Sequence, residues 1–267
     1  MRGRPLRWWR ELAYVAAFYG VYSVIRNQFG SAAVSRAEAL ANADVVIGVE
    51  RALGAFHEGT VQEWFLDLRW FIQGWNLFYG TSHFVVTTAV LVYLFRRWPG
   101  RYVWARDVLA TTTALALVGF ATFPLLPPRL LPASYGFVDT LASYGGLWSF
   151  DSGAVQAVSN QYAAMPSLHV GWSLWCALAL LPVVRRRWAA ALLVAYPVAT
   201  LFATVVTANH FWLDGAGGAA ALALGAVVAS WRDRRRGEVG GAVAPGRPDP
   251  VEVAPAGDRA AAGSISS

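Results

Sequence analysis

Six long apolar segments restrict what this chain can fold into more than any other feature. They cover residues 12–27, 75–95, 108–126, 168–184, 188–207 and 211–231. A helix of about 20 apolar residues spans the hydrocarbon core of a bilayer, and it satisfies its own backbone hydrogen bonds there. We therefore predict an all-α, polytopic membrane protein with six transmembrane helices.

The composition excludes a soluble globular domain. Of 267 residues, 56% are hydrophobic and 14% are charged, and the mean hydropathy is +0.40. The 13 tryptophans and 10 tyrosines are typical of a protein with two membrane–water interfaces. Cys176 is the single cysteine of the sequence, so no intramolecular disulfide can form. The cysteine count therefore does not indicate whether the protein lies in an oxidising or a reducing compartment.

The arginines alternate between crowded and sparse connections. All 22 basic residues are arginine, and the formal net charge is +6. The crowded connections hold Arg2, Arg4, Arg7, Arg10, Arg96, Arg97, Arg101, Arg106, Arg185, Arg186, Arg187, Arg232, Arg234, Arg235 and Arg236. Because positive residues accumulate on the cytoplasmic side, we predict a plasma-membrane protein with both termini in the cytoplasm. The charge is a topology signal, and no nucleic-acid partner is expected.

The first apolar segment follows a basic leader, and no small-residue cleavage site comes after it. We therefore expect residues 12–27 to be a retained anchor rather than a removed signal peptide.

The same topology puts three sets of polar residues at the outer leaflet. Arg129 follows the third segment, His169 lies at the start of the fourth, and His210 and Asp214 lie at the start of the sixth. Polar groups at membrane depth are costly, so they indicate function. Nothing in the arginine pattern required this agreement, and we predict that the residues form one outward-facing site.

Two further regions lie outside the apolar segments. In residues 33–67, apolar residues recur at helical spacing with glutamates between them: Val45, Val49, Leu53 and Phe56, and Glu38, Glu50, Glu58 and Glu63. This pattern predicts an amphipathic helix on the outer surface, a packing element or alternatively a lid. Residues 1–236 form the membrane-embedded domain, and the Gly-, Ala- and Pro-rich residues 237–267 are predicted to be a disordered cytoplasmic tail.

His210 and Asp214 lie four residues apart and share one face of a helix. The aspartate can accept the imidazole Nδ1–H and leave Nε2 free as a nucleophile or base. A capping aspartate beside an interfacial histidine is the alternative. The small residues that follow, from Gly215 to Ala220, predict close packing of this helix on its neighbours.

The stretch Pro166-Ser167-Leu168-His169 has the features of a helix N-terminus, with serine as the cap. Free backbone amides at such an end favour a phosphate, and His169 would point at it. A capped helix with an interfacial histidine is the alternative. Arg129, after two prolines, offers a bidentate fork for phosphate oxygens or snorkels to lipid headgroups.

Asn76, Tyr79 and His83 lie on one face of the second segment. We favour an interhelical hydrogen-bond network for them, with a substrate pocket wall as the alternative. His57, in the outer connection, is expected to be solvated.

The motifs PPR, YAAMPSLHVGWSLW and NHFWLDGAGG together resemble the type 2 phosphatidic acid phosphatase superfamily, in particular its inositol phosphorylceramide synthase-like branch. The resemblance extends to Asn76, Tyr79 and His83 and to Gly136-Phe-Val-Asp139, so it covers roughly residues 10–232. It implies a membrane lipid phosphatase or headgroup phosphotransferase acting at the outer leaflet, on a phospholipid or an isoprenoid or sphingolipid phosphate.

The resemblance also implies roles for individual residues. His210 would attack phosphorus and form a phosphohistidine, Asp214 would orient it, and His169 would protonate the leaving oxygen. Arg129 would bind phosphate oxygens together with Ser167. No metal and no cofactor is implied, although a His/His/Asp set could in principle hold zinc.

The sequence departs from the family pattern around the expected phosphate. No basic residue lies between Thr122 and Pro128, and Leu130 follows Arg129 where a proline is usual. Ala203 and Thr204 occupy the positions of the usual Ser-Arg pair. We expect Arg26, at the outer end of the first segment, to replace a missing cation. The reduced pattern resembles the synthase-like branch and shifts the prediction toward headgroup transfer.

Two other classes of function stay open at this point. A catalytically silent membrane scaffold with the same fold would form no covalent phosphate, and a haem or metal protein would use His83, His169 and His210. The lipid, the acceptor, the choice between hydrolysis and transfer, and the oligomeric state are not predicted.

Overall fold

The computed structural model describes residues 7–29, 34–144 and 161–242, and its regular structure there is helical, with one isolated parallel bridge between Leu125 and Ala163. The longer helices are α1 (Trp8–Phe29), α2 (Arg36–Ala52), α3 (Glu58–Leu66), α4 (Arg69–Arg97), α5 (Pro99–Thr122), α8 (Leu168–Leu180), α9 (Arg187–Val206) and α10 (Trp212–Ala242). Three short elements connect α5 to the rest: η1 (Pro128–Leu130), η2 (Ala133–Tyr135) and α6 (Thr140–Tyr144). The predicted all-α class is confirmed over these residues.

Four of the described helices are long and apolar enough to cross a membrane: α4, α5, α9 and α10 up to Arg235. They coincide with four of the six predicted segments. The predicted segment 168–184 forms α8, which has only 13 residues because Pro182 cannot continue a helix. The segment 12–27 lies within α1, which is not among the four. These two remain predicted spans.

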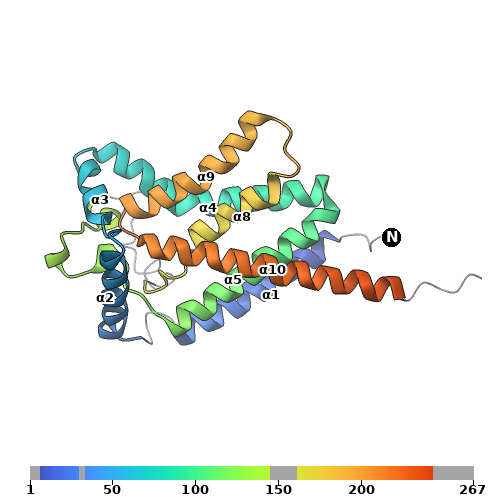
Figure 1. Cartoon of the computed structure of the whole chain (residues 1–267), viewed down its shortest axis with the longest axis horizontal. Coiled ribbons are helices and arrows are strands. Elements are labelled where there is room, and N and C mark those ends of the chain that lie inside the picture. The colour runs from blue at the N-terminus through green and yellow to red at the C-terminus, as the bar shows by residue number, and fades with distance from the viewer. Residues whose placement is uncertain (1–6, 30–33, 145–160, 243–267) are drawn as a thin grey trace, which may run out of the picture.

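Small residues let α10 pack closely on α5 and α8, as predicted. A Cβ atom at Gly218 would meet the Ser167 carbonyl oxygen, and one at Gly225 would lie 3.2 Å from the Val108 carbonyl oxygen. Only glycine permits such backbone approach. Figure 1 shows α10 running along the bundle beside α5, from the end near α2 and α3 to the opposite end. The α10 glycines thereby hold the Ser167 turn against the start of α10.

A buried apolar cluster joins α4, α5, α8 and α10. Its members are Val90, Leu94, Tyr102, Ala105, Val108, Trp175, Cys176, Ala179, Leu222 and Ala229. At its centre, Trp175 is fully buried and donates its indole N–H to the Ala105 carbonyl oxygen at 2.8 Å. This polar partner is what lets a tryptophan be buried completely.

Residues 33–67 were predicted to form a single amphipathic helix on the outer surface, and the structure differs from this prediction. The segment forms two helices, α2 and α3, because Gly54 adopts a left-handed conformation (φ +65°) one residue after the α2 cap. Val45, Val49 and Leu53 are exposed, whereas Glu50 and Glu58 are fully buried. The apolar stripe therefore points away from the protein, and two of the glutamates expected on the polar face point into it.

The arginine-rich connections lie at the end of the bundle away from α2 and α3. Arg96 and Arg97 end α4, and at the start of α5 Arg101 donates to the Ala179 and Leu178 carbonyl oxygens at 2.7 and 2.8 Å. The connection between α4 and α5 therefore meets the end of α8. In Figure 1 this end lies to the right, and α2 and α3 lie to the left.

The last helix continues past the predicted domain boundary at residue 236 and ends at Ala242. Residues 243–267, most of the predicted tail, lie outside the described residues. The tail stays a prediction.

Candidate active site

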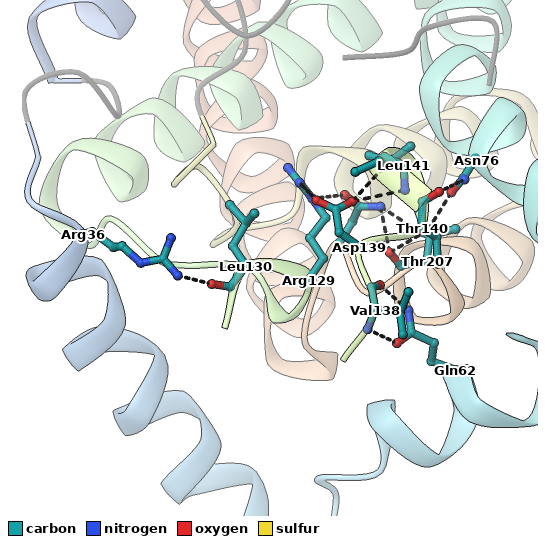
Figure 2. Close-up of polar contacts among 12 residues, drawn as sticks. Arg36, Gln62, Asn76, Arg129, Leu130, Val138, Asp139, Thr140, Leu141 and Thr207 are labelled. Carbon is teal, nitrogen blue, oxygen red and sulfur yellow. Dashed lines mark hydrogen bonds and ion pairs between the residues drawn. The ribbon is translucent and has the colours of Figure 1, made fainter. Parts of the chain in front are cut away.

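Arg129 is held between the ends of α5 and α9. Its backbone N–H donates to the Ala208 carbonyl oxygen at 2.8 Å, which fixes η1 against the turn before α10. Its guanidinium donates from Nε to Asn209 Oδ1 at 3.0 Å and forms an ion pair with Asp139 at 2.8 Å. Arg129 thus lies beside Asn209, the residue that precedes His210. Figure 2 shows the Arg129–Asp139 pair.

Asp139 is itself fixed by the segment around it. Its Oδ1 accepts hydrogen bonds from the Leu141 and Ala142 N–H groups, which caps α6. On one side, Gln62 of α3 both donates to and accepts from the backbone of Val138, at 3.0 and 2.9 Å. Figure 2 shows these contacts together. The Arg129 guanidinium therefore faces a preorganised carboxylate.

Asn76 of α4 joins this segment rather than the histidines. Its side chain donates to the Thr140 carbonyl oxygen at 2.9 Å and accepts from the Thr140 hydroxyl at 3.0 Å (Figure 2). The Thr140 hydroxyl also lies 3.3 Å from the Thr207 carbonyl oxygen. Asn76, for which a hydrogen-bond network was favoured over a pocket wall, thus links α4 to α6 and, through Thr140, to the end of α9.

The turn between α9 and α10 presents His210. Ala208 adopts a left-handed conformation (φ +54°), which is uncommon for a residue with a Cβ. After it, the backbone N–H groups of Asn209 and His210 both donate to the Thr204 carbonyl oxygen, at 2.9 and 3.1 Å. Strained backbone of this kind gathers at functional turns, and here it directs His210 to the start of α10.

His210 and Asp214 form the predicted pair. His210 Nδ1 lies 3.1 Å from Asp214 Oδ2, which also accepts the Phe211 N–H at 3.0 Å. Both side chains are buried, at 3% and 0% exposure. When Asp214 is ionised it only accepts hydrogen bonds, so Nδ1 must carry the proton of this contact and a neutral His210 keeps its lone pair on Nε2. Nε2 is buried and finds no partner among the described residues.

The segment before α8 contacts the same turn. Ser167 is fully buried, caps α8 by accepting the Val170 N–H at 3.4 Å, and donates its own N–H to the Asp214 carbonyl oxygen at 2.9 Å. Among the described residues, no acceptor contacts the backbone N–H groups of Leu168 and His169. The N-terminus of α8 therefore keeps two donors for an anion.

Stacked rings place His169 next to His210. The His169 ring stacks on Tyr79 with centroids 4.2 Å apart, and its centroid lies 5.5 Å from that of His210. The His83 ring lies on another side of His169, also at 4.2 Å, and its Nδ1 is 3.0 Å from the Tyr79 carbonyl oxygen. Tyr79 and His83 therefore pack against His169, and the Tyr79 ring also lies 6.3 Å from that of His210. Contact of these two residues with a substrate stays a prediction.

The structure brings together most residues that were predicted for the site. His169, His210, Asp214, Ser167 and Arg129 converge from three separate segments. The side chain of Arg26 lies outside the described part of the structure, so its role stays a prediction. His57 is exposed at the start of α3. In the described ranges, no group of three or more His, Cys, Asp and Glu side chains is arranged to hold a metal ion.

Two buried glutamates next to the site were missed. Glu50 of α2 accepts the Leu213 N–H at 2.8 Å, and Glu58 of α3 accepts the Trp212 N–H at 3.2 Å. Burial raises the pKa of the Glu50 carboxyl to about 9, and the neighbouring Glu58 carboxyl acts in the same direction. More than 150 residues separate these partners, so no local spacing signals them.

The sequence was compared with protein families, with curated proteins and with solved structures. The family model of the PAP2 superfamily matches residues 44–228, more than half of the chain. The match includes Arg129, His169, His210, Asp214 and both buried glutamates, and it begins after Arg26. No significant match was found among curated proteins or among solved structures. The convergence of the motif residues and the family match agree, and the chain belongs to the PAP2 superfamily.

Proposed function

We propose that this protein is a membrane enzyme that transfers a phosphoryl or phosphodiester group from a lipid through a phosphohistidine at His210, without a metal ion. The observation that carries this proposal is the buried, unpartnered Nε2 of His210, together with Asp214 on Nδ1. Burying an unpaired polar atom is costly. A nucleophile oriented by a carboxylate is the arrangement that gives such an atom a use.

The reaction follows from the neighbouring groups. The lone pair of His210 Nε2 forms a bond to phosphorus, the bond from phosphorus to the leaving oxygen breaks, and His169 donates a proton to that oxygen. In the second step, His169 takes a proton from water or from a lipid hydroxyl, whose oxygen attacks phosphorus and releases His210. With ring centroids 5.5 Å apart, both histidines lie within reach of one phosphoryl group.

Positive groups for the phosphate come from two elements. Arg129 reaches the site through Asn209, and the Leu168 and His169 amides point from the N-terminus of α8. Phosphoryl transfer depends mainly on positioning and charge stabilisation, which these donors supply. A bound phosphate competes with the Asp139 carboxylate for the Arg129 guanidinium, because both are anions that pair with the same fork.

We favour headgroup transfer between lipids over simple hydrolysis. Ala203 and Thr204 are fully buried and uncharged where the family usually has Ser-Arg, so the site carries few cations. A phosphodiester has one negative charge fewer than a phosphomonoester and needs less positive charge around it. This choice also agrees with the resemblance to the inositol phosphorylceramide synthase-like branch.

We further propose that the site faces outward from the plasma membrane and that both termini are cytoplasmic. The support is the separation of charges along the bundle. Arg96, Arg97 and Arg101 lie at the end away from α2 and α3, whereas His210 follows α9 at the end near them. Positive residues favour the cytoplasmic side.

The test uses detergent-purified protein and a phosphatidylinositol labelled with radioactive phosphorus and tritiated inositol. Transfer predicts an acid-labile protein adduct that carries both labels, whereas phosphatase action on labelled phosphatidic acid leaves phosphorus alone on the protein. Addition of ceramide or another lipid alcohol should discharge the adduct into a labelled product.

Two histidine variants make the test specific. His210→Ala should abolish the adduct, and His57→Ala, at an exposed histidine away from the site, should keep it. A phosphorylated His210→Ala protein would contradict the mechanism. A wild-type protein that forms no adduct with any lipid of the panel would instead favour the silent scaffold.

A further inference from the structure

Three carboxylates converge on the N-terminus of α10. Asp214 accepts the Phe211 N–H at 3.0 Å, Glu58 accepts the Trp212 N–H at 3.2 Å and Glu50 accepts the Leu213 N–H at 2.8 Å. All three side chains have 0% exposure. The backbone groups that a helix start leaves unpaired are thus bound by carboxylates. Glu50 and Glu58 come from α2 and α3, so these helices hold the turn that carries His210.

The two glutamates also contact each other. The two carboxyl groups interact with each other, and the Oε2 atom of each is buried without a hydrogen-bond partner among the described residues. Two ionised carboxylates can only accept hydrogen bonds, so they cannot satisfy one another. A single proton between the two groups would give both Oε2 atoms a partner and would leave the pair with one negative charge.

We propose that Glu50 and Glu58 form a proton-sharing pair that positions the His210–Asp214 turn, so that activity depends on the pair keeping its proton. This inference rests on the proposed function of His210. Neither glutamate touches the reacting atoms, and both act through the backbone of α10. The pair is a positioning device contributed by the outer helices, which otherwise cover the end of the bundle.

The surroundings explain why the proton matters. The titratable groups that act on Glu50 are Glu58 from α3 and Asp214 from α10, and both are carboxyl groups. Burial raises the pKa of Glu50 to about 9. Above that pH, three negative charges would lie at one helix start, and no arginine of the described segments pairs with either glutamate. The helix dipole favours one such charge, but repulsion between neighbouring carboxylates drives the glutamates apart.

Movement of α3 would reach both halves of the site. The same short helix carries Glu58, which binds α10, and Gln62, which binds Val138 next to Asp139. Separation of the glutamates therefore shifts the His210 turn and the Asp139 partner of Arg129 together. Since small misplacements of reacting groups cost much rate, loss of the shared proton should lower turnover more than substrate binding.

The test compares Glu50→Gln, Glu58→Gln and Glu50→Ala with the wild type. A glutamine amide donates to the remaining carboxylate and mimics the protonated pair at every pH. The exposed Glu63 of α3 supplies the matched control, Glu63→Gln. The ratio of kcat for Glu50→Gln to kcat for wild type should rise by about tenfold between about pH 7 and about pH 10, with little change in KM. Taking the ratio removes the titration of His169, which both proteins share.

Glu50→Ala should lose activity at every pH and should not be rescued at low pH. A kcat ratio that stays flat for both glutamine variants would overturn the inference. So would a pH-dependent ratio for Glu63→Gln of the same size.

A second readout does not need enzyme activity. Infrared difference spectra should show the carbonyl stretch of a protonated carboxylic acid in wild type near neutral pH, and the band should be absent in Glu50→Gln and in Glu58→Gln. A band that persists unchanged in both variants would overturn the shared proton. If wild type shows the band but forms no phosphohistidine, the proposed function fails and the proton-sharing pair stands.

Discussion

Asp214 and the Glu50–Glu58 pair place buried carboxylates at the start of α10, but these carboxylates have different hydrogen-bond partners. Asp214 pairs with His210 four residues away, on its own helix turn. Glu50 and Glu58 come from two other helices, and their Oε1 atoms accept backbone N–H groups of α10. A buried carboxylate needs partners that donate hydrogen bonds. His210 supplies one to Asp214, whereas the Oε2 atoms of the two glutamates gain one only if a proton lies between them.

This difference suggests two roles: Asp214 would take part in the reaction, and Glu50 and Glu58 would position the turn that carries His210. Asp214 contacts a ring nitrogen of His210, the proposed nucleophile, and can therefore orient it directly. The glutamates bind backbone N–H groups and control where that nucleophile lies. Removal of the first should therefore cost rate with little change in fold, and removal of the second should change both stability and the pH dependence of the rate.

The largest effect that sharpens this contrast is expected for Asp214→Asn. An amide can present its NH₂ group to Nδ1, which moves the imidazole proton to Nε2 and removes the nucleophilic lone pair. We expect a fall in kcat of about 10²–10⁴-fold, with a small change in melting temperature. Steady-state kinetics and thermal unfolding in detergent measure the two quantities.

The matched variant for this prediction is Glu58→Gln, which makes the same carboxylate-to-amide change in the Glu50–Glu58 pair. It should retain most of the wild-type rate near neutral pH. Equal losses in Asp214→Asn and Glu58→Gln would mean that both carboxylates serve one structural role, and the proposed division would be wrong.

An intermediate effect is expected on stability as a function of pH. The folded-state pKa of Glu50, about 9, lies above its ordinary value of 4.5, so the folded protein holds this proton where the unfolded chain has lost it. Stability from this group is complete below about pH 4.5 and declines as the pH rises to about 9. We expect the melting temperature of wild type to fall by a few degrees more than that of Glu50→Gln over this window.

Glu63→Gln again serves as the control, because this exposed side chain should leave the wild-type pH dependence unchanged. Equal changes in melting temperature for wild type and Glu50→Gln between about pH 4.5 and about pH 9 would contradict this prediction. They would mean that ionisation of Glu50 does not destabilise the folded protein.

The smallest effect concerns the turn that both carboxylate sets support. Ala208 has φ +54°, a conformation that glycine adopts at little cost. Ala208→Gly should raise stability by about 0.5 kcal/mol, the relief of strain being partly offset by greater freedom of the unfolded chain. Ala203→Gly, inside α9, should lower it by about 0.5–1 kcal/mol. A destabilised Ala208→Gly would show that the turn stores no strain.

Much of the candidate site was predictable because its signals are local. The spacing of His210 and Asp214 places them on one helix face, Ser167 has the position of a helix cap, and the glycines of α10 indicate close packing. Each of these inferences needs only residues within one or two turns. The helical class and four long apolar spans are likewise properties of single segments.

Other features were not predictable for the same reason. The stripe of Val45, Val49 and Leu53 has helical spacing, but spacing alone cannot tell whether it faces the protein or its surroundings. The spacing predicted Glu50 on a polar helix face, but its carboxylate is buried and accepts the backbone N–H of Leu213. Likewise, the ion pair of Arg129 with Asp139 depends on how the chain between η1 and α6 is folded.

Sequence alone was enough to predict that the chain is helical and apolar, and that His169, His210, Asp214 and Arg129 lie in one site. Periodicity and motif spacing depend only on residues that are neighbours along the chain, so they can be recognised before the fold is known. The contacts between distant segments became visible only in the tertiary structure. It joined α2 and α3 to the start of α10 and made Glu50 and Glu58 buried partners, because burial and hydrogen bonding depend on segments that meet only in three dimensions.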